Sequence, residues 1–219
     1  PRSAPGFWQG RGAAAWCLFP LSLLFAFLAG LRRRLFALGL LKVERLPVPV
    51  IVVGNIAVGG SGKTPIALWL ADALRARGHR PGIVSRGYGG SVEGTAEVPT
   101  GGDPALYGDE PVLMAALSGC PVWVGRDRPS AGRSLLAAHP EVDVLIADDG
   151  LQHYRLARDV EIIVVDEATL GNRFRLPAGP LREGLGRLAE ATVVLAQGGL
   201  SPALRAAIGP APVFGFELA

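Results

Sequence analysis

Residues 50–65 have the sequence VIVVGNIAVGGSGKTP. An apolar run rich in β-branched residues ends there at a glycine-rich turn, and the turn closes with Gly62-Lys63-Thr64. A buried strand that leads through such a turn into a helix typically binds nucleotide phosphates, because the backbone N–H groups of the turn converge on phosphate oxygens. One position departs from the pattern G-x-x-x-x-G-K-[ST]: Ala57 stands where its first glycine belongs. We expect a phosphate-binding loop.

The residues of this loop have separate expected roles. Lys63 is expected to reach the β- and γ-phosphates of ATP, and the Thr64 hydroxyl to ligate Mg²⁺. The alternative is an ordinary strand-to-helix turn with a surface lysine. The chain has 22 basic residues but only two lysines, Lys42 and Lys63, which favours a functional lysine. The backbone N–H groups expected to contact phosphate belong to Gly59, Gly60, Ser61 and Gly62.

Composition limits the class of protein. The 219 residues are enough for one domain and part of another, and 49% of them are hydrophobic, which suggests a membrane segment in a globular protein. Two cysteines form no disulfide framework and indicate a reducing compartment. Seven basic residues and one acidic residue give residues 1–45 a formal charge of +6, so the rest carries −3 of the overall +3. A mildly acidic body argues against a nucleic-acid partner.

Residues 13–31 contain no charge, and Arg32-Arg33-Arg34 follows at once. Nineteen helical residues at about 1.5 Å each nearly match a hydrocarbon core of roughly 30 Å. Because basic flanks stay cytoplasmic, we expect an anchor with its N-terminus outside and its C-terminus inside. Pro20 and Gly30 weaken an ideal span, so a buried core helix and a helix lying in the membrane interface stay open as alternatives.

The rest of the chain alternates short β-like runs with helical stretches, which predicts a parallel sheet flanked by helices. Strands are expected at 48–55, 80–85, 121–125, 142–147, 160–166 and 192–196. Helices are expected at 63–77, 110–117 and 128–138, and a loop at 91–106. The fold class is therefore α/β, with a P-loop NTPase-like sheet after an N-terminal membrane helix.

The strand expected at 142–147 ends in Asp148-Asp149-Gly150. A carboxylate at the carboxyl end of a buried strand is where a P-loop protein holds Mg²⁺. Neighbouring strand residues point to opposite faces, so one carboxylate is expected to face the metal and the other to contact the loop or a substrate. A plain turn after a core strand is the alternative.

Three classes of P-loop protein compete. A regulatory GTPase needs an Asn-Lys-x-Asp motif, which is absent from the sequence. A partitioning ATPase of the deviant Walker type needs a lysine before Gly59-Gly60, where Val58 stands. A small-molecule or lipid kinase needs only the loop, metal-binding carboxylates and a base, and passes both tests.

Five motifs follow the apolar helix in order: GNIAVGGSGKTP, SRGYGG, GDEP (108–111), DDGLQH (148–153) and LPAGPLRE (176–183). As a set they resemble the tetraacyldisaccharide 4′-kinase family, over nearly the whole chain. The resemblance implies ATP- and Mg²⁺-dependent phosphorylation of the 4′-hydroxyl of a tetraacylated glucosamine disaccharide 1-phosphate. The lipid substrate would be met at the cytoplasmic face of the bacterial inner membrane, as a step of lipid A biosynthesis. A membrane-tethered nucleotide-binding module without lipid kinase activity is the alternative.

The resemblance also implies residue roles. Asp109 would be the base for the acceptor hydroxyl, although the residues alone favour an N-cap of the 110–117 helix. Arg182 would stabilise phosphate charge, and Glu183 would join Thr64, Asp148 and Asp149 on the metal side. Supporting roles fall to Ser85, Arg86, Gln152 and His153, with His153 expected to be a structural hydrogen bonder. Arg126 and Arg128 are expected either to contact phosphate or to form a solvated basic turn.

The expected organisation has three parts. Residues 1–45 form the anchor and its basic flank, residues 46–188 the kinase core, and residues 189–219 the beginning of a second, smaller α/β domain. In the family, a histidine of that domain pairs with the GDEP aspartate, and none of the three histidines here lies in a matching motif. The resemblance thus predicts a C-terminally truncated kinase, in which nucleotide binding survives better than turnover.

Overall fold

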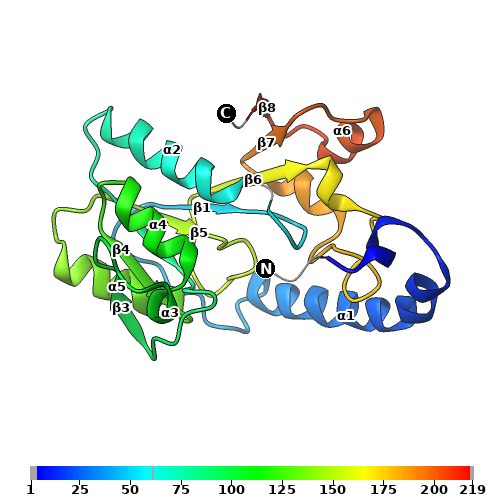
Figure 1. The fold of residues 1–219 in the computed structure, drawn as a ribbon, viewed down its shortest axis with the longest axis horizontal. Helices are drawn as coiled ribbons and strands as arrows, with labels where there is room; N and C mark the ends of the chain where they lie inside the picture. Colours follow the sequence, from blue (N-terminus) through cyan, green and yellow to red (C-terminus); the bar gives the residue numbers. More distant parts are fainter. Residues whose placement is uncertain (1–3, 61, 218–219) are drawn as a thin grey trace. The chain divides into compact units, whose positions relative to one another are not determined.

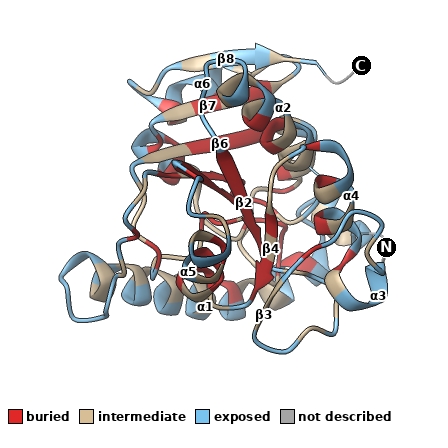
Figure 2. Cartoon of the chain, turned by 90° about the vertical axis from the view of Figure 1, so that its left-hand side faces the viewer, coloured by how far each residue is buried: buried red, intermediate tan, exposed pale blue. Residues whose placement is uncertain are grey.

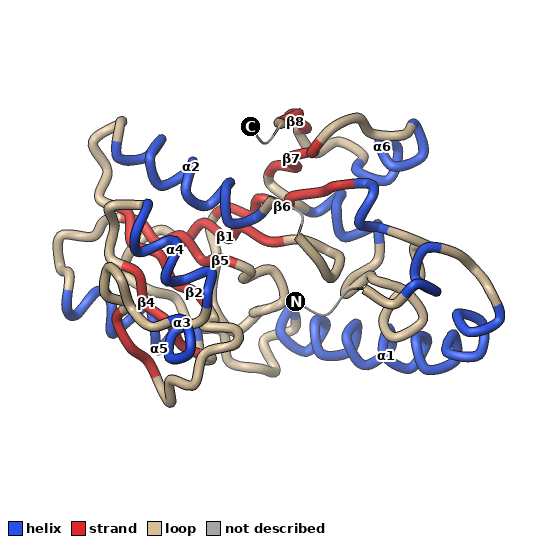
Figure 3. Tube along the Cα trace, in the orientation of Figure 1, coloured by secondary structure: helices blue, strands red, loops and turns tan. Residues whose placement is uncertain are grey.

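The computed structural model describes residues 4–60 and 62–217. Helices and strands alternate along most of the chain (Figures 1 and 3). The chain divides into two compact units, each assembled from segments that are distant in sequence. Unit 1 comprises Pro1–Leu41, Asn55–Gly62 and Ile162–Ala219, and unit 2 comprises Lys42–Gly54 and Lys63–Glu161. The division expected from sequence, at 45/46 and 188/189, stays a prediction.

Unit 2 is built on a mostly parallel sheet. Its strands are β1 (Val50–Gly54), β2 (Pro81–Ser85), β3 (Thr95–Glu97), β4 (Val122–Gly125) and β5 (Val144–Asp148), in the order β3-β4-β2-β5-β1. Only the short edge strand β3 runs antiparallel to its neighbour. Strands β2 and β5 are buried along their whole length, as a sheet covered on both faces requires (Figure 2).

Helices cover both faces of this sheet. Helices α2 (Lys63–Arg75) and α4 (Asp109–Leu117) pack together on one face, and α5 (Arg128–Ala138) packs against β2, β3 and β4 on the other (Figure 1). Leu135 of α5 and Leu145 of β5 are fully buried in the core beneath α5. Burial of each stabilises the fold by roughly 1.5–3 kcal/mol. A short helix, α3 (Pro104–Tyr107), precedes α4.

Unit 1 contains a smaller parallel set of strands, β6 (Val160–Asp166, from Ile162 onward), β7 (Val193–Gln197) and β8 (Val213–Phe216), in that order. The connections carry the 3-10 helices η2 (Glu167–Leu170) and η3 (Leu185–Glu190) and the helix α6 (Pro202–Ile208). At the N-terminus, η1 (Gly6–Gln9) leads into α1 (Ala13–Ala37), a helix of 25 residues.

Helix α1 is long and apolar enough to cross a membrane, with a mean hydropathy of 2.1 in its most apolar window. Its less exposed residues recur about every three or four positions along its whole length: Ala15, Leu18, Phe19, Ser22, Phe25, Ala26, Ala29, Gly30, Arg33, Leu35 and Phe36. The other side presents large apolar side chains, including Leu24 and Phe27, which are 54% and 64% exposed. One stripe of α1 therefore faces protein, and the remainder is open.

Most expected elements occur within two residues of their expected ends, and two expectations are wrong. The 91–106 segment is not all loop, because it contains β3 and the start of α3. Asp109 is not an N-cap: it is the first residue of α4, and Gly108 occupies the cap position without a side-chain bond. The capping aspartate of this region is Asp103, whose carboxylate accepts a hydrogen bond from the N–H of Ala105 at the start of α3.

Candidate active site

Lys63 and Asp149 lie together at one edge of the unit 2 sheet. Lys63 begins α2, Asp149 follows β5, and the Lys63 Nζ lies 3.8 Å from Asp149 Oδ1. Strands β1 and β5 are parallel neighbours, with Val53 opposite Asp148, so the segments that follow them leave the same edge. Asp149 has φ 45°, a left-handed conformation that aspartate tolerates better than most residues. The carboxylate is thereby turned toward the lysine.

Asp148 is the last residue of β5 and is 1% exposed. Its Oδ2 accepts a hydrogen bond of 3.3 Å from the Ser85 hydroxyl. Burial raises the pKa of Asp148 to about 7, and the charges of Glu110 and Asp149 add to this rise. Oδ1 of Asp148 is buried and has no hydrogen-bond partner among the residues that the structure describes. An ionised, unpartnered oxygen at this depth is costly without a cation beside it.

Arg128, the first residue of α5, is 2% exposed. Its guanidinium donates to the main-chain carbonyls of Asp148 (2.8 Å) and Gly125 (3.1 Å). Burial lowers its pKa to about 10, so the group stays charged at neutral pH. The expectation of a solvated basic turn is wrong for Arg128, because its guanidinium is buried against the ends of β4 and β5. Arg126 is exposed, and both readings of it stay predictions.

His153 has the structural role expected of it. Its Nε2 accepts a hydrogen bond of 3.3 Å from the backbone N–H of Arg128, which assigns the ring proton to Nδ1. The N–H of His153 in turn donates to the carbonyl of Gly150. The imidazole therefore joins the loop after β5 to the start of α5. Gln152 lies half-buried in the same loop.

The SRGYGG and GDEP motifs are in backbone contact. A Cβ on Gly90 would lie 2.3 Å from the carbonyl oxygen of Leu106, and a Cβ on Gly108 would lie 2.4 Å from that of Tyr88. Gly108 also has φ 89°. These glycines are therefore required where the two segments approach, and the contact fixes the start of α4, which carries Asp109.

Asp109 is exposed, and its carboxylate makes no hydrogen bond or ion pair with another described residue. Its neighbour Glu110 acts on the site through its charge, which raises the pKa of Asp148. Sequence reasoning assigned no role to Glu110. The feature of the sequence that could have indicated a role for Glu110 is its position next to Asp109 in GDEP, where two carboxylates are adjacent.

The glycine-rich loop belongs to unit 1. Gly59 and Gly60 are exposed, and a Cβ on either would meet no atom of the described residues within 4 Å. Gly59 and Gly62 have φ angles of 127° and 77°, which only glycine adopts readily. Asn55, 1% exposed, donates from Nδ2 to the carbonyl of Gly59 (3.4 Å). Ser61 lies outside the described residues.

The LPAGPLRE motif lies beside this loop within unit 1. The N–H of Val58 donates to the carbonyl of Pro180 (2.8 Å), and the N–H groups of Arg182 and Glu183 donate to the carbonyl of Ile56 (2.7 and 3.2 Å). Segments more than 120 residues apart in sequence are thus paired through the backbone. Arg182 and Glu183 emerge, half-buried, next to the glycine turn.

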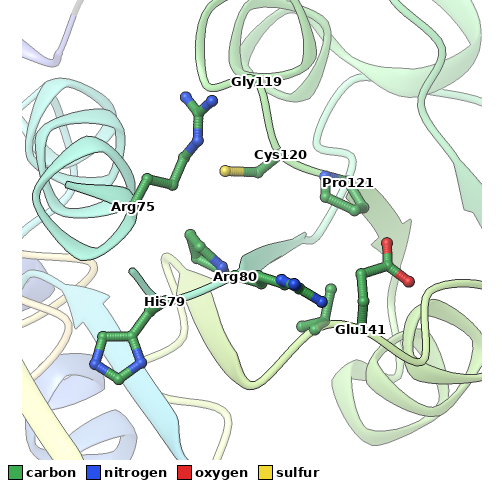
Figure 4. A pocket seen from close by; sticks show the side chains of 9 residues that line it. Arg75, His79, Arg80, Gly119, Cys120, Pro121 and Glu141 are labelled. Atoms are coloured by element: carbon green, nitrogen blue, oxygen red, sulfur yellow. The ribbon is translucent and has the colours of Figure 1, made fainter. Parts of the chain in front are cut away.

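A separate pocket of about 190 Å³ lies at the other edge of the unit 2 sheet (Figure 4). Pro81, Pro121 and Val142 line it where the chain enters β2, β4 and β5, and Arg75 contributes from the end of α2. Ligands of parallel α/β sheets bind at the carboxyl ends of the strands, where Lys63, Asp148 and Asp149 lie. The pocket is therefore not part of the candidate site.

Comparisons with known proteins identify relatives of this chain. A sequence model of the family described as tetraacyldisaccharide-1-P 4′-kinase matches residues 14–218. A protein named tetraacyldisaccharide 4′-kinase from Aromatoleum aromaticum is 62% identical over 99% of this chain and 65% of its own length. One of the same name from Azoarcus sp. is 62% identical over 90% of this chain and 58% of its own length.

A crystal structure of LpxK from Aquifex aeolicus in complex with ATP superposes with a TM-score of 0.80 at 35% identity. It covers 92% of this chain, and the match takes up 64% of that protein. The chain thus spans less than two thirds of the length of these relatives. The match to nearly all of its residues shows that the chain belongs to the tetraacyldisaccharide-1-P 4′-kinase family.

Proposed function

We propose that the chain carries the core of an ATP-dependent kinase that phosphorylates the 4′-hydroxyl of a tetraacylated glucosamine disaccharide 1-phosphate in lipid A biosynthesis. Family membership supports this proposal, as does the ATP bound to the Aquifex aeolicus relative. The observation on which this proposal rests is the arrangement of Lys63, Asp148 and Asp149. Lys63 meets Asp149 beside the buried Asp148, whose Oδ1 has no partner among the described residues.

The nucleotide is assigned to the glycine turn. The N–H groups of Gly59, Gly60, Ser61 and Gly62 bind phosphate oxygens, and Lys63 neutralises the β- and γ-phosphates. Arg182 adds a second cation from the segment paired with the loop. The open space around Gly59 and Gly60 supports this assignment, because backbone N–H groups bind phosphate only where no side chain blocks the approach.

The donor set fits Mg²⁺. Carboxylate and hydroxyl oxygens are its preferred protein ligands, and the buried Oδ1 of Asp148 lacks the partner that a cation supplies. Thr64, Asp148, Asp149 and Glu183 are the residues proposed to hold it. When bound, Mg²⁺ neutralises charge on the transferring phosphoryl group.

Asp109 is proposed as the base that accepts the proton of the acceptor hydroxyl. Its exposed carboxylate, at the start of α4, makes no ion pair with a described residue and is available to a substrate. A carboxylate suffices for this role, because phosphoryl transfer depends mainly on positioning.

We propose that α1 binds the lipid bilayer in which the acyl chains of the substrate reside. Ser22, in the middle of the apolar segment, is 3% exposed and hydrogen-bonded to other parts of unit 1, so lipid does not surround the helix there. This favours an interfacial helix, its open apolar side in the bilayer, over a span. The exposed Arg32 and Arg34 suit the anionic cytoplasmic face of the inner membrane, where ATP is present.

The test combines binding with turnover. A version of the protein as long as its relatives is incubated with ATP, Mg²⁺ and the tetraacyldisaccharide 1-phosphate in mixed micelles, beside the variants Lys63→Ala, Asp109→Ala and Lys42→Ala. We expect Lys63→Ala to lose nucleotide binding, Asp109→Ala to bind nucleotide without transfer, and Lys42→Ala to match the wild type. Mg–ATP binding without any transfer would indicate a nucleotide-binding module, and no binding at all would refute the proposal.

A further inference from the structure

Helix α1 is hydrogen-bonded to the segment that carries the LPAGPLRE motif. The Ser22 hydroxyl donates to the carbonyl of Arg175 (2.8 Å) and accepts from the N–H of Ala178 (3.0 Å). Both contacts lie within unit 1. A serine in the middle of a 25-residue apolar helix has no packing advantage over alanine or leucine, so its two bonds to a distant backbone call for an explanation.

Other contacts reinforce this attachment. Asn172, 6% exposed, donates from Nδ2 to the carbonyls of Gly10 (3.1 Å) and Ala178 (2.9 Å), and its Oδ1 accepts from the N–H of Phe174. The indole of Trp8 donates to the carbonyl of Pro177 (3.0 Å). Residues 172–178 are therefore held to the N-terminal residues at several points.

The same segment continues directly into the phosphate loop. Two residues after Ala178, the carbonyl of Pro180 accepts from Val58, and Leu181 forms an antiparallel bridge with Ala57. Residues 178–181 are all buried, and Pro177 and Pro180 restrict their backbone. A displacement of α1 at Ser22 thus reaches the backbone of the loop through a few constrained residues.

The open side of α1 is the one that we propose to enter lipid, and Ser22 lies on the other side. We propose that Ser22 is a positioning residue that couples binding of α1 to a lipid surface with binding of Mg–ATP at the glycine turn. This inference rests on the proposed function. Lipid holds α1 in one orientation, and the segment 175–183 then holds the loop backbone in the conformation that binds phosphate. Linkage requires that nucleotide strengthen lipid binding by the same factor.

The experiment measures the Mg–ATP dissociation constant of the chain with and without vesicles of phosphatidylethanolamine and phosphatidylglycerol. We expect vesicles to tighten binding about fivefold or more in the wild type, the lower end of typical coupling. Ser22→Ala should lose this response while still binding vesicles, and Ser22→Thr, which keeps a hydroxyl, should retain it.

Two variants serve as controls. Ser134→Ala removes a helical hydroxyl bonded to Thr95 in unit 2 (3.1 Å) and should keep the full vesicle response. Leu24→Asp should abolish the response by preventing lipid binding, with the affinity for Mg–ATP in solution unchanged. If Ser22→Ala fails to fold, Leu24→Asp still tests whether lipid binding by α1 tightens Mg–ATP binding, and Ser22→Thr still tests the hydroxyl of residue 22.

The outcomes separate the two proposals. A vesicle response in Ser22→Ala equal to that of the wild type overturns the coupling role, and so does a wild type that binds Mg–ATP equally with and without lipid. In both cases the proposed function stands. If the wild type binds no Mg–ATP under either condition, the proposed function fails and the coupling fails with it.

Discussion

The guanidinium of Arg128 is bonded to the main-chain carbonyl of Asp148, at 2.8 Å, and not to its carboxylate. The arginine thus anchors the end of β5 and brings a positive charge near the carboxylate without occupying its oxygens. Ser85 bonds only one of those oxygens, which leaves Oδ1 for another ligand. The arrangement holds the carboxylate of Asp148 in place and keeps its Oδ1 available to a ligand.

Replacement of Arg128 by methionine tests its anchoring role. The change leaves the buried carbonyls of Gly125 and Asp148 without their donor, so we expect the free energy of unfolding to fall by about 3 kcal/mol. Denaturation by urea measures this free energy for the wild type and the variant. Arg126→Met, two residues away and exposed, should stay within about 0.5 kcal/mol of the wild type. Equal effects of the two changes would contradict a buried structural role for Arg128.

Replacement of Glu110 by glutamine should shift the pH dependence of Mg–ATP binding. Burial is the main cause of the raised pKa of Asp148 and Glu110 the next, so removal of that charge lowers the pKa. Metal binding requires the ionised carboxylate and should therefore persist to lower pH in the variant. Titration of Mg–ATP affinity between about pH 5.5 and pH 8 measures the midpoint. An unchanged midpoint, or an equal shift in the exposed control Glu93→Gln, would refute this expectation.

Much of the fold and of the candidate site can be predicted from the sequence alone. The features that cannot be predicted have physical causes. The run VLIAD and the glycine turn predict that Lys63 and Asp149 lie at the same end of the sheet, because strand periodicity is a local property and parallel strands all have their carboxyl ends on one side. Burial of Arg128 was not predictable, because it depends on how α5 packs against β4 and β5. The contact of Ser22 with Arg175 joins segments 153 residues apart, which no local pattern encodes.

His139 provides a test of stability against pH. Hydrogen bonds that its ring donates to the carboxylates of Glu97 (2.9 Å) and Glu141 (3.3 Å) raise the pKa of His139 in the folded chain. A raised pKa contributes stability that is complete below the unfolded value and is lost as pH rises through the folded value. We therefore expect the wild type to lose stability relative to His139→Gln between about pH 6 and pH 8. Parallel curves of unfolding free energy against pH would show that His139 contributes nothing.

Gly108→Ala should disturb both stability and the position of Asp109. A Cβ there would meet the carbonyl oxygen of Tyr88 at 2.4 Å, and φ is 89°, so we expect a loss of about 1–3 kcal/mol of unfolding free energy. Gly186→Ala meets no described atom within 4 Å and serves as the control. If Asp109 is the base, Gly108→Ala should lower kcat for phosphoryl transfer more than it weakens Mg–ATP binding. An equal loss of kcat and of Mg–ATP affinity would indicate that Gly108→Ala acts through overall folding and not through the position of Asp109.

Phe27→Asp tests the open side of α1 as the lipid-binding surface. Phe27 is 64% exposed, and its replacement removes a large apolar side chain and adds a charge that is costly to bury. Loss of roughly 1.5–3 kcal/mol of apolar burial should lower vesicle partitioning about tenfold or more. Flotation with phosphatidylglycerol vesicles measures the partitioning, and Leu106→Asp, a change at another exposed apolar position (46%), on α3, should have no effect. If both variants lose vesicle binding equally, binding depends on overall hydrophobicity, and α1 is not the lipid-binding surface.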